Sequence, residues 1–405
     1  MQKLIDVTKY PIKDVLDVLL EDKTTRKNIV WATDAYAHLG EDFSDESHIA
    51  ASALIGGDAV VLSPRVNKEI DEQQERTKKR AEVYTPSWLC NKMNNYCDQQ
   101  WFGRKNVFNF ENDDCTWTET EIPVYFVEKK GRKTKPWQSY VDSKRLEITC
   151  GEAPYLVSRY DAATGEILPI KRRIGILDRK LRVVNENAKD ETEWLQWAQR
   201  AVESCYGYEY QGDSLLVARN NVLMTFYDYY NERWNKLPRK RLLRKIANIV
   251  AWNIWQMDGI SDLIPLGKLE PDAARNSLLA FCGLEGSEEE KNNEQEEEVR
   301  AAKPCVIKNW RSRKTFTFKS LKETGNMEKK MFDFVIGNPP YQEDFSSDGN
   351  KTYAAPVYNT FMDASFGVAD CTVLIHPARF LFNAGSTPKQ WNEKMLEDPH
   401  LKVLQ

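Results

Sequence analysis

Residues 332–341 limit the possible folds of this chain more than any other segment. Residues 332–336 read Phe-Asp-Phe-Val-Ile, and Gly337, Asn338, Pro339, Pro340 and Tyr341 follow directly. A short apolar run bounded by turn residues is typical of a strand buried in a sheet. Each proline fixes φ near −65° and removes a backbone donor. The segment therefore predicts a buried strand that ends abruptly in a stiff polar turn.

Other segments predict the rest of a sheet. Residues 145–150, 206–210 and 372–376 read as strands, and a helical pattern through Leu223 follows the second of them. Residues 241–255 fit either an amphipathic helix or a buried strand, and residues 151–156 predict a turn followed by a helix. Strands separated by helices indicate an α/β fold with a mostly parallel, doubly wound sheet. Ligands of such sheets bind at the carboxyl ends of the strands.

The length of 405 residues corresponds to roughly two or three domains. We expect residues 1–80 to form a helical N-terminal segment that ends in an exposed charged helix over residues 68–80, and residues 81–405 to form the main domain. The main domain should begin with a helix that Thr85 caps and in which Pro86 is the first residue. Residues 103–140 predict a loop-rich stretch, and the acidic run at residues 285–301 predicts a looped insertion.

Composition excludes several classes of protein. The eight cysteines form no Cys-x-x-Cys pair and the four histidines are isolated, which argues against a zinc site or a disulfide framework. No run reaches the ~20 apolar residues of a membrane helix, and the first residues lack an apolar signal segment. We therefore expect a cytoplasmic protein. The sequence also contains no internal repeat, Walker motif or serine nucleophile elbow.

The net charge of −4 hides an uneven distribution. Acidic residues concentrate between residues 285 and 298, whereas basic residues form four clusters at 129–135, 171–173, 239–245 and 311–319. Local patches decide phosphate binding, and the average charge does not. A single basic cluster is most often a solvated face, but four together favour a polyanionic partner.

The turn at residues 338–341 suits chemistry on a planar amine. The lone pair of such a nitrogen is delocalised into the ring, so the nitrogen becomes nucleophilic only when acceptors hold its hydrogens. The Asn338 side-chain oxygen and the Pro339 carbonyl are such acceptors, and the prolines keep them fixed, as electrostatic preorganisation requires. Tyr341 offers a flat face for an extruded base. The alternative is a strand-to-turn connection that uses Asn-Pro-Pro only for its geometry.

In this motif the sequence resembles the gamma-class N6-adenine DNA methyltransferases of type II restriction–modification systems, whose catalytic motif is Asn/Asp-Pro-Pro-Tyr/Phe. The resemblance implies a Rossmann-like methyltransferase fold, S-adenosyl-L-methionine as cofactor, and double-stranded DNA with a flipped adenine as substrate. Enzymes that methylate glutamine in release factors share the motif, so a protein glutamine methyltransferase remains an alternative. A catalytically decayed DNA-binding subunit is a second one.

The resemblance also assigns cofactor-binding residues. Thr85 and Pro86 match a segment that packs over the methionine end of the cofactor in the family. Residues 147–156 resemble a variant of the cofactor turn, which gives Glu147, Cys150 and Gly151 as candidates, although Ile148 replaces a proline and a second glycine is absent. Glu209 would accept the ribose hydroxyls, with a surface glutamate as the alternative. Asp258 would accept from the adenine amine of the cofactor.

The resemblance extends over about residues 82–382. Family members continue beyond the last strand with further sheet strands and a target-recognition domain. We therefore expect a C-terminally incomplete domain, in which a missing C-terminal segment or a partner chain supplies target recognition and any cleavage. No nuclease signature occurs in a plausible setting.

Overall fold

A computed structural model describes residues 4–56, 60–68, 85–127, 134–267, 302–324, 329–344, 354–382 and 386–402. The expected helix over residues 68–80, most of the first basic cluster and the acidic insertion lie outside the described residues. The helices are α1 (Leu16–Leu20), α3 (Ser87–Phe102), α4 (Pro136–Val141), α5 (Ile176–Asn187), α6 (Glu191–Glu203), α7 (Gly212–Trp234), α8 (Lys240–Asn253), α10 (Phe318–Thr324), α11 (Tyr358–Val368) and α12 (Lys389–Leu396).

Five strands form the central sheet, which is entirely parallel. Their order is β11-β8-β3-β4-β5. The bounds are β3 (Arg145–Ile148), β4 (Cys205–Glu209), β5 (Ile254–Gln256), β8 (Phe332–Gly337) and β11 (Ala369–Leu374). The first strand of the sheet, β3, therefore lies at its centre. The next two strands, β4 and β5, lie on one side of β3, and the last two, β8 and β11, lie on the other side. The direction of winding reverses between β3 and β8, and ligands bind at such a switch point in open α/β sheets.

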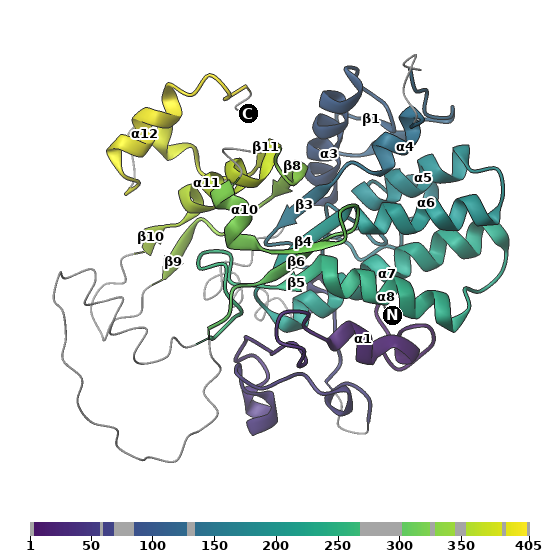
Figure 1. Cartoon of the computed structure of the whole chain (residues 1–405), viewed down its shortest axis with the longest axis horizontal. Coiled ribbons are helices and arrows are strands. Elements are labelled where there is room, and N and C mark those ends of the chain that lie inside the picture. Colours follow the sequence, from purple (N-terminus) through teal and green to yellow (C-terminus); the bar gives the residue numbers. More distant parts are fainter. Residues whose placement is uncertain are drawn as a thin grey trace.

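Side chains alternate between the two faces of the sheet, and each face has its own cover. Cys205, Ile254 and Phe334 belong to the large core beneath α3–α8, whereas their neighbours on the same strands, such as Tyr206 and Trp255, belong to a second core. The second core lies under α10, α11 and the antiparallel pair β6 (Val306–Asn309) and β7 (Lys314–Thr317). Figure 1 shows these two layers on opposite sides of the strands.

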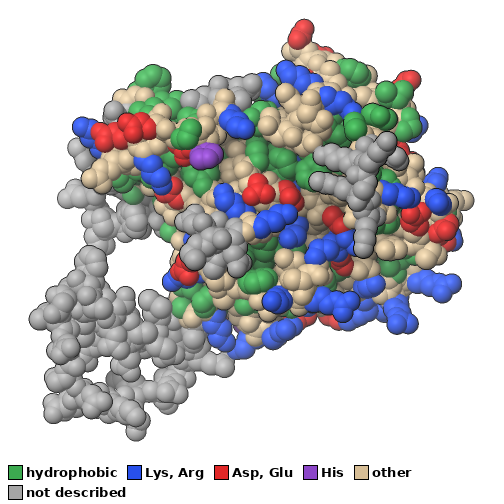
Figure 2. All heavy atoms as spheres, turned by 45° about the horizontal axis from the view of Figure 1, so that its top comes forward, with side chains coloured by type: hydrophobic (Ala, Val, Ile, Leu, Met, Phe, Trp, Pro, Cys, Tyr) green, Lys and Arg blue, Asp and Glu red, His purple; other side chains and the backbone are tan. Residues whose placement is uncertain are grey.

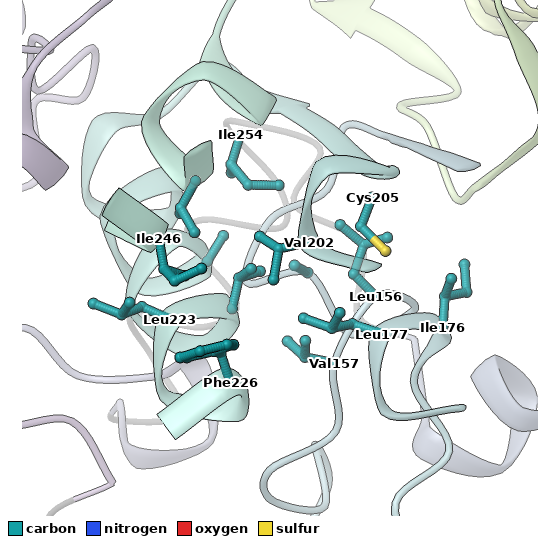
Figure 3. Packing of buried hydrophobic residues seen from close by; sticks show 14 of the residues in the cluster. Leu156, Val157, Ile176, Leu177, Val202, Cys205, Leu223, Phe226, Ile246 and Ile254 are labelled. Carbon is teal, nitrogen blue, oxygen red and sulfur yellow. The ribbon is translucent and has the colours of Figure 1, made fainter. Parts of the chain in front are cut away.

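The large core fills the space between α3–α8 and the sheet. Figure 3 shows apolar side chains from α5, α6, α7 and α8 gathered in one cluster with Leu156 and Val157, which follow β3. Local signals delimit these helices. Asp190 caps α6 by accepting the amide of Glu193 at 2.9 Å, while α3 ends at Gly103 and α7 at Asn235, both in the left-handed conformation that commonly ends helices.

Within the described ranges, three small antiparallel pairs accompany the central sheet. One is β6–β7, and another is β1 (Asn109–Glu111) with β2 (Trp117–Glu119), inside the stretch predicted to be rich in loops. The third joins β9 (Gln342–Asp344) to β10 (Ala354–Pro356) directly after the polar turn. For residues 241–255 the sequence was compatible with either a helix or a strand. The segment contains both, because α8 is followed directly by β5 without an intervening loop. The strand predicted at residues 372–376 begins earlier, at Ala369.

The predicted helix after the turn at residues 151–156 is wrong. The chain runs through turns there, with positive φ at Gly151 and Ala153, and the next α-helix begins at Ile176. The buried Glu147 carboxylate explains the difference, since it accepts the amides of Tyr155 and Leu156. These contacts fix a compact loop at the residues where the helix was expected to begin.

The expectation of a mostly helical N-terminal segment is also wrong for residues 4–56 and 60–68. They contain α1 and short 3-10 turns within irregular chain. Side chains compete with helix formation here: Asp22 accepts the amides of Thr24 and Thr25 at 3.2 and 2.8 Å, a local pattern that favours turns. The segment lies along α7 and α8 (Figure 1) and contributes to the same large core, so it is an integral part of the main body.

No helix within the described ranges is long and apolar enough to cross a bilayer.

Candidate active site at the carboxyl ends of the strands

The polar turn at residues 338–341 begins where β8 passes close to β3 at Gly337. A Cβ atom on Gly337 would lie 2.7 Å from the carbonyl oxygen of Ile148, so only glycine allows this approach. The Gly337 carbonyl accepts the amide of Ile375 at 3.0 Å, which ties the end of β8 to the segment after β11. Asn338 is therefore held at the carboxyl end of β8, as the sequence predicted, and this end lies at the switch point of the sheet.

Both ends of the Asn338 carboxamide are hydrogen-bonded. The Tyr341 hydroxyl donates to Asn338 Oδ1 at 2.7 Å, and Asn338 Nδ2 donates to Thr85 Oγ1 at 3.1 Å. Pro339 is buried, while Asn338 and Tyr341 are half-buried. The Tyr341 carbonyl accepts the amide of Val357 at 3.0 Å, which fixes the far end of the turn. The structure thus joins Asn338, Tyr341 and Thr85 directly.

Thr85 does not cap α3, contrary to the sequence prediction. The helix begins at Ser87, Pro86 occupies the N-cap position, and no side chain caps the helix. Pro86 is extended, with ψ of 147°, so it precedes the first helical residue. The Thr85 side chain is only 5% exposed and contacts Asn338. Thr85 therefore lies beside the polar turn, and α3 begins one residue later than predicted. The packing of this segment against the cofactor stays a prediction.

Glu147 organises the turn after β3. Its carboxylate is 1% exposed and accepts the amides of Tyr155 and Leu156 at 3.3 and 3.0 Å. Burial raises the pKa of Glu147 well above its ordinary value, and the two backbone hydrogen bonds oppose that rise. The contacts within the structure make Glu147 a support of the turn.

Gly151 and Glu209 meet at the ends of β3 and β4. The Gly151 amide donates to Glu209 Oε2 at 2.9 Å, and Glu209 Oε1 accepts the amide of Gln211 at 3.1 Å. Gly151 has φ of +52°, and a Cβ built on it would meet nothing within 4 Å. The space beside the Gly151 backbone is thus open, and it adjoins the Glu209 carboxylate. A ligand can approach the backbone closely there.

The other two cofactor candidates direct their side chains elsewhere. Cys150 is buried, and a Cβ on Gly207 of β4 would lie 3.1 Å from its Sγ. Burial raises the pKa of the Cys150 thiol well above its ordinary value, which keeps it protonated. Asp258 follows β5 and binds within its own turn, accepting the Ile260 amide at 2.9 Å and the Ser261 hydroxyl at 2.7 Å.

The N-terminal segment reaches the same edge of the sheet, which the sequence did not predict. Gln256, the last residue of β5, donates to the Val30 carbonyl and accepts the Val30 amide at 2.9 and 3.0 Å. Tyr36 donates to Asp213 at 3.0 Å, at the start of α7. No periodicity or motif in the sequence predicts these contacts, because the partners lie 226 and 177 residues apart.

A second contact joins the N-terminal segment to the turn after β3. Glu152 accepts the Arg65 amide at 2.5 Å and the Tyr160 hydroxyl at 2.8 Å. Asn221 on α7 donates to the same Tyr160 hydroxyl at 3.0 Å. Residues 60–68 therefore pass over the turn that carries Gly151.

Some basic residues counted as clusters in the sequence stabilise the fold. Arg173 pairs with Asp228 at 2.8 Å, Arg244 pairs with Asp17 at 2.7 Å, and Arg311 pairs with Glu203 at 2.7 Å. Figure 2 shows basic and acidic side chains intermingled over one face. The clusters described by the structure thus combine ion-paired arginines with exposed residues. Among the described residues no group of three or more His, Cys, Asp or Glu side chains could hold a metal ion.

Comparison with known proteins gives one match. The model of a protein family described as Eco57I restriction-modification methylase matches residues 203–405, which is half of the chain. The matched range begins at the end of α6 and includes β4, β5, β8 and β11, together with the polar turn. Searches of curated proteins and of solved structures found no match.

Proposed function

The chain belongs to the Eco57I restriction-modification methylase family, and from this premise we propose that it transfers a methyl group from S-adenosyl-L-methionine to N6 of an adenine flipped out of double-stranded DNA. The family makes the chain a DNA methyltransferase of a restriction–modification system. The five-stranded parallel sheet is compatible with a methyltransferase fold, and its order corresponds to the 3-2-1-4-5 core of the Rossmann type.

The observation that carries the choice of adenine N6 is the environment of Asn338 Oδ1. This oxygen accepts the Tyr341 hydroxyl at 2.7 Å at the switch point of the sheet. An acceptor that binds an O–H donor in a half-buried site can bind an N–H donor there in its place. The exocyclic amine of adenine presents two such hydrogens, and the Pro339 carbonyl is the second acceptor in the same stiff turn.

The residues at the ends of β3 and β4 fit the expected cofactor. The accessible backbone at Gly151 allows a close approach, and the two oxygens of the neighbouring Glu209 carboxylate suit vicinal ribose hydroxyls, as in dinucleotide folds. When bound, the cofactor supplies an electrophilic methyl group. Cys150 and Asp258 take part through their backbone or after their side chains turn, since both side chains have other partners in this structure.

The chain's own residues then have defined tasks. Asn338 Oδ1 and the Pro339 carbonyl accept the amine hydrogens, so that the nitrogen lone pair becomes available as the nitrogen becomes tetrahedral. Pro339 and Pro340 keep both acceptors in place, which is the source of preorganised electrostatic stabilisation. The Tyr341 ring provides a stacking surface for the base once it has left the duplex. The nitrogen–methyl bond would form as the sulfur–methyl bond breaks, which leaves a neutral thioether, and the amine would then lose its proton to solvent.

The first prediction tests this proposal. Tritium transfer from labelled S-adenosyl-L-methionine to mixed-sequence duplex DNA, followed by nucleoside analysis, should place the label in N6-methyladenine. Asn338→Ala should lower the rate by on the order of 10²–10³, the usual cost of losing one preorganised hydrogen-bonding group. Cofactor affinity, measured by calorimetry, should stay close to that of the wild type.

Other outcomes separate the alternatives. Label in another base, or in an added release factor in place of DNA, would contradict the adenine assignment. Failure of the wild type to bind cofactor would favour the DNA-binding subunit with a decayed site. Loss of cofactor affinity in Asn338→Ala would refute the role given to Asn338.

A further inference from the structure

A chain of hydrogen bonds runs through the polar turn and continues beyond it. Tyr341 donates to Asn338, and Asn338 Nδ2 donates to Thr85 Oγ1 at 3.1 Å. Tyr155 lies next to Thr85, and its hydroxyl donates to Met93 Sδ at 3.2 Å. Burial raises the pKa of the Tyr155 phenol, and the hydrogen bond from Thr85 opposes that rise. The polar turn, the segment before α3 and the turn after β3 are thus connected through side chains.

The direction of this chain decides how the Asn338 carboxamide is oriented. A carboxamide has an acceptor oxygen at one end and an NH₂ donor at the other, and a half-turn of the amide exchanges them. In the structure Asn338 Nδ2 donates to Thr85 Oγ1, while Asn338 Oδ1 accepts the Tyr341 hydroxyl. The Thr85 oxygen is thus the acceptor for the NH₂ end of the amide, and the two contacts together favour this orientation.

The orientation matters for the chemistry proposed above. With Nδ2 on Thr85, Asn338 Oδ1 points to the position that the Tyr341 hydroxyl now occupies. With the amide reversed, NH₂ would face the hydrogens of the substrate amine, and the nitrogen would lose an acceptor. A residue that fixes the amide acts on the rate of transfer without touching the substrate.

We propose that Thr85 is a positioning residue for the methyl transfer, which holds the Asn338 carboxamide with its oxygen toward the target amine. This inference rests on the proposed function and deepens it. It gives Thr85 a task toward the nucleophile, whereas the sequence resemblance assigned Thr85 to the cofactor. The Tyr341 hydroxyl is the exchangeable donor on the same amide, which the amine of the incoming base replaces.

The surroundings of Thr85 allow its hydroxyl to be removed without loss of the fold. The α3 helix is anchored further along, where Asn94 donates to the carbonyls of Tyr155 and Ile174 at 3.0 and 3.1 Å. Asp98 on the same helix binds Arg145 at 2.8 Å. The backbone at the start of α3 therefore stays in place when the Thr85 side chain changes.

The test compares three variants in the full chain. Thr85→Val keeps the shape and removes the hydroxyl. It should lower kcat by about 10- to 100-fold, by analogy with the loss of a residue that orients a metal-binding side chain. The KM and Kd for S-adenosyl-L-methionine should not change. Thr85→Ser restores a hydroxyl and should recover most of kcat.

The matched control is Ser87→Ala. Ser87 lies two residues further on, is also 5% exposed, and also uses its hydroxyl to accept one N–H, that of Ala162 at 3.0 Å. This variant should keep the kcat of the wild type. If Ser87→Ala and Thr85→Val lowered kcat equally, both effects would be due to a disturbed fold, and the proposal would be overturned.

Two further outcomes would overturn it. Unchanged kcat in Thr85→Val would show that the hydroxyl does not orient Asn338. If Thr85→Val lowered the affinity for S-adenosyl-L-methionine as much as kcat, Thr85 would be a cofactor-binding residue, as the sequence resemblance implied.

A measurement that needs no activity separates this inference from the proposed function. Solvent exchange of the Asn338 side-chain NH₂ can be followed by NMR with ¹⁵N-asparagine, with its signal assigned through Asn338→Ala. Thr85→Val should accelerate this exchange, and an unchanged rate would refute the contact. A wild type that methylates no DNA would refute the proposed function while the exchange rate still decides the contact.

Discussion

At the scale of single residues, Tyr341 carries two groups whose effects can be separated. Its hydroxyl binds Asn338 Oδ1 in the structure, while its ring is the proposed stacking surface. Tyr341→Ala removes both and should weaken binding of the extruded base by roughly 1–3 kcal/mol, the usual value for one aromatic stack. Tyr341→Phe keeps the ring and should bind the base as the wild type does.

The measurement is the affinity for two duplexes, one with the target adenine and one with an abasic site at its position. The loss in Tyr341→Ala should appear only with adenine. A large loss with the abasic duplex would count against stacking, because that duplex offers no base to stack.

Lys180 predicts a pH dependence of stability. Its ammonium group is fully buried and donates to Ser204 Oγ at 2.6 Å and to the Ser143 carbonyl at 2.5 Å. Burial lowers the pKa of Lys180 from 10.5 to about 8. Between these two pH values the unfolded chain binds more protons than the folded one, so the contribution of Lys180 to stability rises with pH. The cost of its burial is fully present below pH 8.

Urea unfolding of the wild type and of Lys180→Met at pH 7 and pH 10 checks this prediction. The wild type should gain stability relative to the variant as the pH rises. A difference in the free energy of unfolding that stays constant with pH would mean that Lys180 titrates as it does in the unfolded chain.

At the scale of elements, one buried carboxylate joins α3 to β3 and α5. Asp98 binds Arg145 at 2.8 Å and Arg179 at 2.7 Å, and all three side chains are at most 2% exposed. Asp98→Asn leaves two buried guanidinium groups without a counter-charge. It should lower the free energy of unfolding by about 3–5 kcal/mol, as is found when one partner of a buried pair is removed.

The matched control is the pair of Asp17 with Arg244, whose side chains are 64% and 42% exposed. Asp17→Asn should cost about 0–1 kcal/mol, because solvent screens exposed pairs. Denaturant unfolding measures the free energy of unfolding of both variants. Similar decreases in the two would contradict the expectation that the buried pair contributes more to stability than the exposed pair.

The same scale shows which parts were predictable from sequence. Strand β8 was predicted because a local apolar run ends in a recognisable turn, and the position of Asn338 followed from β8 alone. The helix expected after residue 151 failed because Glu147 binds the amides of Tyr155 and Leu156, a contact without a sequence signature. The partner of Thr85 was equally hidden, since Asn338 lies 253 residues away.

At the scale of the whole molecule, the N-terminal segment and the sheet domain share a core. Arg219 on α7 shows how closely they are joined. Its guanidinium is fully buried and donates to the carbonyls of Leu19 and Glu21 in the N-terminal segment, and to those of Ala251 and Ile254 in α8 and β5. One side chain therefore connects three parts of the chain.

This arrangement predicts that the N-terminal segment and the sheet domain unfold together. Arg219→Met leaves buried carbonyls without donors, at about 1–3 kcal/mol for each unsatisfied group, and should lower the unfolding midpoint of the whole molecule. Hydrogen exchange should show equal loss of protection in peptides from residues 13–31 and from α7. Arg233→Met, an exposed change on the same helix, should leave both unchanged. Loss of protection confined to residues 13–31 would mean that the segment is a separate unit, and that its contacts at the carboxyl ends of β4 and β5 form independently of the core.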